Sequence, residues 1–144
     1  MEMIPILSDL TNEQFESLLS ICTKQDIPCY TLIFKEGDSA NEMFILTEGS
    51  LKVTLGGIKI GRILPISTVG EMGVLTGAVR SATVITMSKS TLLRIMRKDL
   101  FDLFDKDKDF YIKYQRGMLL DLSKKLRDTN ETIAKLRVKL DKIC

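Results

Sequence analysis

Residues 70–84 form the segment in which residue types and spacing most clearly permit ligand chemistry. Their sequence is GEMGVLTGAVRSATV, in which Glu71 and Arg80 are the only charged residues. An arginine presents a planar fork of N–H donors that matches phosphate oxygens, and it keeps its charge. A carboxylate repels a phosphate but accepts hydrogen bonds from hydroxyl groups. The two residues could therefore hold opposite ends of a phosphorylated sugar, or they could form a structural ion pair with each other.

The remaining residues of the segment are small, apolar or hydroxylic. Such residues let the backbone come close to a ligand. We expect MGVLTG, residues 72–77, to form a short helical turn whose first amides face the anion.

The overall composition argues against several kinds of protein. With 144 residues, 44% of them hydrophobic and 28% charged, the chain can fill one core and carry one appendage. Histidine is absent, and the three cysteines show no CxxC spacing. Because histidine is the commonest general base and metal ligand, we expect no enzymatic activity, no metal and no cofactor. The net charge of +2 does not indicate nucleic-acid binding.

The N-terminal stretch MEMIPILSDLTNEQ carries acidic residues where a signal peptide would be basic. No run approaches the roughly 18 apolar residues of a membrane span. We therefore expect a cytoplasmic protein with no membrane association. In that compartment Cys22, Cys29 and Cys144 should be reduced thiols.

Two kinds of periodicity divide the chain. Residues 11–22 predict a short helix, because Thr11 and Gln14 fit a capping box ahead of apolar residues at helical spacing. From about Cys29 the period changes to two. Glycine turns then separate short strands, and Gly56-Gly57 supplies the positive-φ positions of a tight hairpin. This pattern predicts an antiparallel β-roll.

The C-terminal part is helical from Leu100, with one long helix from about Phe110 to the end. A heptad seam runs along it, with Leu119, Leu126, Ile133 and Leu140 at a, and Leu122, Thr129, Leu136 and Ile143 at d. The seam predicts a parallel coiled coil in a homodimer, and the alternative is a helix packed on its own roll. We interpret its basic residues as the solvated flank of the coiled coil rather than as a DNA-binding arm: Lys124, Lys125, Arg127, Lys135, Arg137, Lys139 and Lys142.

One place in the seam is polar, because Thr129 occupies a d position and Asn130 the neighbouring e position. A buried polar residue can set the register of a coiled coil. Alternatively, a polar ligand lies against the helix at this point.

These features together resemble a known family. The segment GEMGVLTGAVRSATV is similar to the phosphate-binding cassette of cyclic nucleotide-binding domains, and residues 33–53, IFKEGDSANEMFILTEGSLKV, resemble the two-glycine signature ahead of it. The order of elements also matches: an N-terminal helix, a β-roll containing the cassette and a long C-terminal helix. Within the family the likeness is greatest to the sensor part of bacterial catabolite activator protein and other Crp/Fnr-type regulators.

The resemblance implies an α+β fold with two parts. Residues 1–109 would form a cyclic nucleotide-binding β-roll, of the double-stranded β-helix or jelly-roll-like kind, with its N-terminal helix. Residues 110–144 would form a coiled-coil dimerisation helix. No metal site is implied.

The resemblance also assigns roles to individual residues. Glu71 and the backbone of Gly70 would hold the ribose 2′-OH, while Arg80 and Ser81 would bind the cyclic phosphate, with Met72 lining the pocket. Thr129 of one protomer and Asn130 of the other would meet the base.

Two residues bear on the choice of base. Asn130 stands where relatives have serine, and an amide suits the N6/N7 edge of adenine. Ser81 is also compatible with guanine. We therefore expect cAMP as the ligand, with cGMP as the other possibility.

The expected function is a cyclic nucleotide sensor that transmits ligand occupancy through its C-terminal helix to a downstream protein partner, without a DNA-binding domain of its own. One alternative is the sensor fragment of a longer Crp/Fnr-type transcription regulator. Another is a dimerisation module whose pocket has degenerated.

Overall fold

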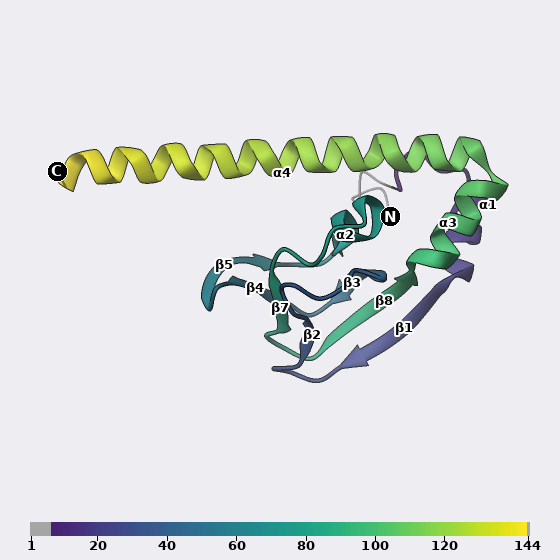
Figure 1. Ribbon diagram of the computed structural model, residues 1–144, viewed down its shortest axis with the longest axis horizontal. Coiled ribbons are helices and arrows are strands. Elements are labelled where there is room, and N and C mark those ends of the chain that lie inside the picture. Colours follow the sequence, from purple (N-terminus) through teal and green to yellow (C-terminus); the bar gives the residue numbers. More distant parts are fainter. Residues whose placement is uncertain (1–6, 144) are drawn as a thin grey trace.

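The protein is a β-roll with a long helix lying along one side of it (Figure 1). The computed structural model describes residues 7–143, which form eight strands and four helices. The predicted α+β fold, with a short N-terminal helix and a long C-terminal helix, is confirmed. The N-terminal residues 1–6 and Cys144, on which the expectations of no leader and a third thiol partly rest, lie outside the described residues.

The strands form two four-stranded antiparallel sheets. The first sheet has the order β1 (Cys22–Ile27), β8 (Ser90–Met96), β3 (Glu42–Glu48) and β6 (Ser67–Val69). The second has the order β2 (Leu32–Phe34), β7 (Thr83–Thr86), β4 (Leu51–Leu55) and β5 (Ile58–Ile63). The predicted hairpin at Gly56-Gly57 is confirmed, because Leu55 pairs with Ile58 and both glycines have positive φ.

The N-terminal helix α1 spans Asn12–Ser20 and has the predicted capping box between Thr11 and Gln14. Its predicted extension through Cys22 is wrong, because β1 begins at that residue. β1 lies at the edge of its sheet and pairs with β8, and its sequence CTKQDI is mostly polar. It therefore lacks the apolar alternation by which strands are recognised in a sequence.

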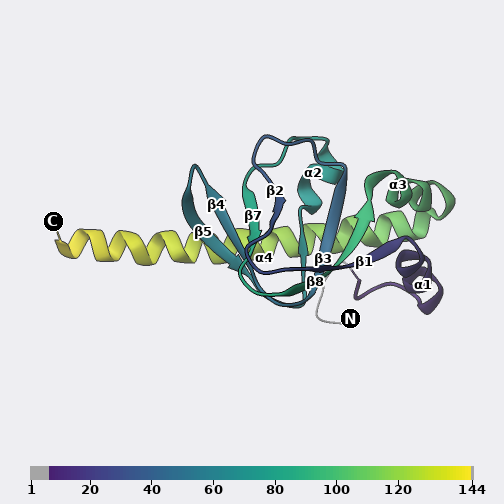
Figure 2. The ribbon, with the colours of Figure 1, turned by 90° about the horizontal axis from the view of Figure 1, so that it is seen from below.

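Three helices complete the chain: α2 (Glu71–Thr76), α3 (Arg97–Lys106) and α4 (Lys108–Ile143). Viewed from below in Figure 2, α4 passes across the roll and its C-terminal part continues beyond it. Every residue from 123 to 143 is exposed in the single chain. Within residues 7–143, no helix combines the length and the apolar character that a membrane crossing requires.

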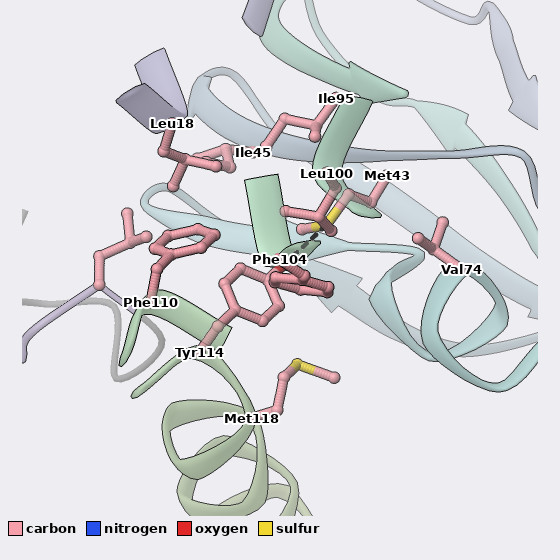
Figure 3. Packing of buried hydrophobic residues seen from close by; sticks show 11 residues of the cluster. Leu18, Met43, Ile45, Val74, Ile95, Leu100, Phe104, Phe110, Tyr114 and Met118 are labelled. Carbon is pink, nitrogen blue, oxygen red and sulfur yellow. Dashed lines mark hydrogen bonds between the residues drawn. The ribbon is translucent and has the colours of Figure 1, made fainter. Parts of the chain in front are cut away.

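The first part of α4 belongs to the hydrophobic core. Phe110, Tyr114 and Met118 pack with Leu18 of α1 and Leu100 of α3 (Figure 3). The Tyr114 hydroxyl donates to the Met43 sulfur at 3.0 Å, and burial raises the pKa of this hydroxyl. Deep apolar burial of this kind supplies most of the stability of a domain. The packed core therefore fixes where α4 passes over the roll.

Candidate functional site

The candidate site lies at α2, which joins the two sheets between β6 and β7. Gly70 precedes the helix in a left-handed conformation, with φ +76, and Glu71 is its first residue. Val74 points into the core beside Met43 (Figure 3), where it is fully buried. Its carbonyl accepts a 2.9 Å hydrogen bond from the Arg97 side chain. These contacts hold Glu71 in one place.

Arg80 is fixed by its backbone and by its side chain. Its backbone N–H donates to the Asp38 carbonyl, and its own carbonyl accepts from the Gly37 N–H, both at 2.8 Å. The guanidinium donates to the carbonyls of Gly70, at 2.8 Å, and Glu42. It also lies 4.1 Å from the centre of the Phe34 ring. A cation over an aromatic face is an attractive contact.

The electrostatics of Arg80 follow from its position. Its side chain is buried, with 5% of the residue exposed. Burial lowers the pKa of the guanidinium, and the nearby carboxylates, that of Glu42 first, oppose this shift. Because arginine begins far above neutral, it remains a cation. The site therefore holds a permanent positive charge.

Glu71 is also buried, at 5% exposed, but its ionic partner is Lys125 of α4 rather than Arg80. The Lys125 Nζ lies 2.8 Å from Glu71 Oε1 and 3.0 Å from Asp121 Oδ2. Burial lowers the pKa of Lys125, but the charges and hydrogen bonds of these two carboxylates outweigh it, so the pKa is raised. Among residues 7–143, no ion pair joins Glu71 to Arg80, so the structural pair considered from the sequence does not form.

Glu71 and Arg80 line one pocket with a volume of about 270 Å³. This is close to the lower end of ordinary small-molecule sites, roughly 300 Å³. Gly70, Met72 and Ser81 line the same pocket, so five of the predicted site residues are brought together. The rest of the wall is mainly apolar or small, from Phe34, Val53, Ile63, Thr68, Val69, Gly73, Thr76, Ala78, Val79, Ala82, Val84 and Leu122.

Thr129 and Asn130 are not part of this pocket in the single chain. Both are exposed on α4, and the Thr129 hydroxyl donates to the Lys125 carbonyl at 2.9 Å. Thr129 is one helical turn beyond Lys125, so the two residues lie on the same face of α4. Their contact with a base remains a prediction that depends on a bound ligand and a second chain.

Sequence reasoning did not assign Phe34, Leu122 and Lys125 to the site, although all three line the pocket. The sequence places Lys125 in the solvated flank, and its side chain is half exposed, but its ammonium also pairs with the buried Glu71. A usable signal was its spacing, since Lys125 follows the seam residue Leu122 by three and so shares its helix face. Leu122 itself is half-buried and packs against the core of its own chain.

The arrangement can bind a small molecule with three chemical features. A permanent cation suits an anionic group, a buried carboxylate suits a hydroxyl donor, and the apolar wall suits a flat ring. The pocket and the two-sheet roll around it define a ligand-binding domain of the β-roll class.

Comparison with known proteins identifies the family. The sequence model of the cyclic nucleotide-binding domain matches residues 24–107, more than half of the chain. The chain therefore belongs to the cyclic nucleotide-binding domain family, and the resemblance noted in the sequence is confirmed. Domains of this family are typically regulatory.

Solved structures share the fold. A cyclic nucleotide-binding domain from Methylobacillus flagellatus superimposes with a TM-score of 0.82 at 19% identity, covering 92% of this chain and 81% of that one. The catabolite activator protein of Thermus thermophilus has a TM-score of 0.75 at 23% identity, covering 92% of this chain and 62% of that one.

Among curated proteins, an NTE family protein of Mycobacterium bovis is 27% identical over 103 residues. The match covers 71% of this chain but only 18% of the relative. The chain thus corresponds to one part of a much longer protein in that case.

Proposed function

We propose that this chain is a cyclic nucleotide sensor, with cAMP as its first ligand and cGMP as the other candidate. The observation that carries the proposal is the meeting of Glu71 and Arg80, both buried and not paired with each other, in one pocket. Glu71 would accept from the ribose 2′-OH, and Arg80 with Ser81 would hold the cyclic phosphate. Met72 and the apolar wall would face the rings.

We infer further that the exposed part of α4, residues 123–143, mediates homodimerisation. In the dimer, Thr129 of one protomer and Asn130 of the other would reach the base, and the asparagine favours adenine. Leu122 and Lys125 already line the pocket from α4, which supports a route from the ligand to this helix. A ligand that contacts both the roll and α4 would bind best at one position of α4 relative to the roll. It would shift the population toward that position only by the difference between its affinities for that position and for others.

The output of such a sensor would be a protein, reached through α4, rather than direct contact with nucleic acid or membrane. Binding without chemistry is sufficient for this role, so we propose no enzymatic activity for the chain itself. Its place of action would be the cytoplasm. Because the chain spans about a fifth of the Mycobacterium bovis relative, the sensor part of a longer regulator is the alternative.

Thermal unfolding of the chain with cAMP, cGMP and 5′-AMP tests the proposal. A ligand at about 100 times its Kd stabilises the folded state by about 2.7 kcal/mol. For a domain of this size the Tm should then rise by roughly 5–10 °C. The cyclic nucleotides should produce this rise and 5′-AMP should not. If none of the three raises the Tm, the pocket is degenerate and the chain is a dimerisation module.

Ser81→Asp is a sharper probe, because Ser81 is an exposed residue that lines the pocket. A carboxylate there would repel the phosphate while leaving the unliganded fold unchanged. The cyclic nucleotide should no longer raise the Tm. Ser17→Asp, on the exposed surface of α1, is the matched control and should respond like the natural chain. An undiminished response in Ser81→Asp would contradict the proposed phosphate position.

A further inference from the structure

The buried carboxylate of the pocket has an ionic partner within its own chain. Glu71 is 5% exposed, and the Lys125 Nζ lies 2.8 Å from its Oε1. A carboxylate removed from water must be paired or hydrogen-bonded, because its desolvation is otherwise very unfavourable. An ammonium from α4 therefore already contacts one of the two Glu71 oxygens to which a ligand hydroxyl could donate.

We propose that Lys125 is an internal competitor of the ligand for Glu71, and that it sets the affinity of the site for nucleotides that carry a 2′-hydroxyl. The inference rests on the proposed function, because it assumes that Glu71 receives that hydroxyl. It adds a residue and a mechanism of control that the cassette alone does not contain.

Lys125 can leave Glu71 without losing its only partner. Asp121, one turn earlier on α4, holds the same ammonium at 3.0 Å and is itself only 14% exposed. The Lys125 side chain is half exposed, so water can replace the contact with Glu71. The ammonium therefore keeps an acidic partner on its own helix when it gives up Glu71, and Asp121 lowers the free energy of that change.

The exchange at Glu71 works against the ligand. A hydroxyl is a neutral donor, and a charge-assisted bond from an ammonium to a buried carboxylate is stronger. Replacing the ammonium by the hydroxyl at Glu71 is therefore unfavourable. The difference in free energy between the two bonds makes the binding free energy of the nucleotide less favourable. A ligand hydroxyl that takes the place of Lys125 at Glu71 would therefore also break the ionic link between α2 and α4.

Calorimetric titration of the full chain with cAMP and 2′-deoxy-cAMP tests this competition. Lys125→Met should bind cAMP about three- to tenfold more tightly, since each tenfold corresponds to about 1.4 kcal/mol. It should bind 2′-deoxy-cAMP no more tightly than the natural chain does, because that ligand leaves Glu71 to Lys125. Lys124→Met is the matched control: Lys124 is the exposed neighbour, with no ion pair among residues 7–143, and its loss should change neither affinity.

Asp121→Asn provides a second variant with the opposite sign. Without the second carboxylate, Lys125 is bound more firmly to Glu71, so cAMP should bind more weakly and 2′-deoxy-cAMP should be unaffected. If Lys125→Met binds cAMP equally or less tightly than the natural chain, Lys125 is not a competitor and the inference is overturned. If the natural chain binds neither nucleotide, the proposed function fails as well, so the two failures are distinguishable.

Discussion

Arg80 is held by main-chain carbonyls from two separate parts of the chain. Its guanidinium bridges Gly70, ahead of α2, and Glu42, at the start of β3, and it lies over Phe34. These contacts orient the cation in advance, which lowers the entropy lost on binding. They also mean that Arg80 contributes to the fold and not only to the ligand site.

Replacing Arg80 should therefore weaken the unliganded protein. Arg80→Met leaves two carbonyls without their charged donor and should lower the free energy of unfolding by about 2–4 kcal/mol. Urea unfolding without nucleotide measures this. Arg62→Met, at an exposed position of β5, is the control and should have little effect. Equal midpoints for the two variants would show that Arg80 is not a structural residue.

Gly70 is required for two reasons that can be separated. Its φ of +76 is unfavourable for other residues, and a Cβ there would overlap the Arg80 guanidinium. Gly57 in the β4–β5 hairpin has a similar φ of +80, but no described residue other than its chain neighbours lies within 4 Å of the position its Cβ would take. Gly57→Ala therefore measures the backbone effect alone.

We expect Gly70→Ala to destabilise the protein by about 1–3 kcal/mol more than Gly57→Ala does. It should also weaken nucleotide binding, because the guanidinium must move. Urea unfolding and calorimetric titration of both variants provide the measurements. Equal destabilisation by the two substitutions would mean that Arg80 yields to the methyl group without strain.

At the scale of elements, a polar network ties α1 to the junction of α3 and α4. The side-chain Nε2 of Gln14 donates to Asp107 Oδ2 at 3.2 Å and to Asp109 Oδ2 at 2.8 Å. The Lys113 Nζ pairs with Asp109 Oδ2 at 2.9 Å and donates to the side-chain Oε1 of Gln14 at 3.2 Å. The hydrogen bond from Lys113, followed by that from Gln14, lowers the pKa of Asp109. The network thus helps to set the direction in which α4 leaves the core.

The lowered pKa of Asp109 predicts a pH dependence. Because the folded pKa is below the unfolded one, near 3.9, the stabilisation is complete above about pH 4 and is lost as the pH falls through the folded value. Asp109→Asn should unfold at lower urea than the natural chain at pH 7, and the gap should close toward pH 2. The exposed Asp105→Asn removes a carboxylate of α3 without touching the network and serves as the control. A gap that stays constant with pH would contradict the prediction.

At the scale of the whole molecule, α4 continues beyond the roll, and its residues 123–143 are exposed in the single chain. The apolar seam residues in the exposed part, Leu126, Ile133, Leu136 and Leu140, are each more than half exposed. A helix with no packing partner is marginally stable in water, since most helical stability in proteins comes from tertiary contacts. A second copy of the chain supplies such contacts in the proposed coiled coil.

Two residues of α4 make a matched test of that dimer. Ile133 and Val138 are β-branched and almost equally exposed, at 53% and 54%, but Ile133 is at position a of the seam and Val138 at f. Ile133→Thr should dissociate the dimer at micromolar concentration, whereas Val138→Thr should leave it intact. Sedimentation velocity distinguishes the two. A natural chain that sediments as a monomer at that concentration would refute the coiled coil.

Much of the fold could be predicted because its signals are local. The Thr11–Gln14 capping box, the Gly56-Gly57 hairpin and the heptad seam of α4 each depend on neighbours within a few residues. The cassette from Gly70 to Ser81 is equally local, which is why those site residues were found together. The sequence pattern did not predict β1, because an edge strand can be polar and because β1 pairs with β8, which is distant in the sequence.

The ionic partner of Glu71 could not be predicted from local sequence patterns. The sequence contains a carboxylate that either pairs with Arg80 or receives a ligand, and nothing within the cassette distinguishes the two. The answer depends on where α4 crosses the roll, and that is fixed by the packing of Phe110, Tyr114 and Met118, which lie 39 or more residues beyond Glu71 in the sequence. This packing brings Lys125 into an ion pair with Glu71, while the Arg80 guanidinium donates to backbone carbonyls. Residue types and local periodicity thus define the chemical groups of the site, while the pairing of its charges follows from long-range packing, which no local pattern records.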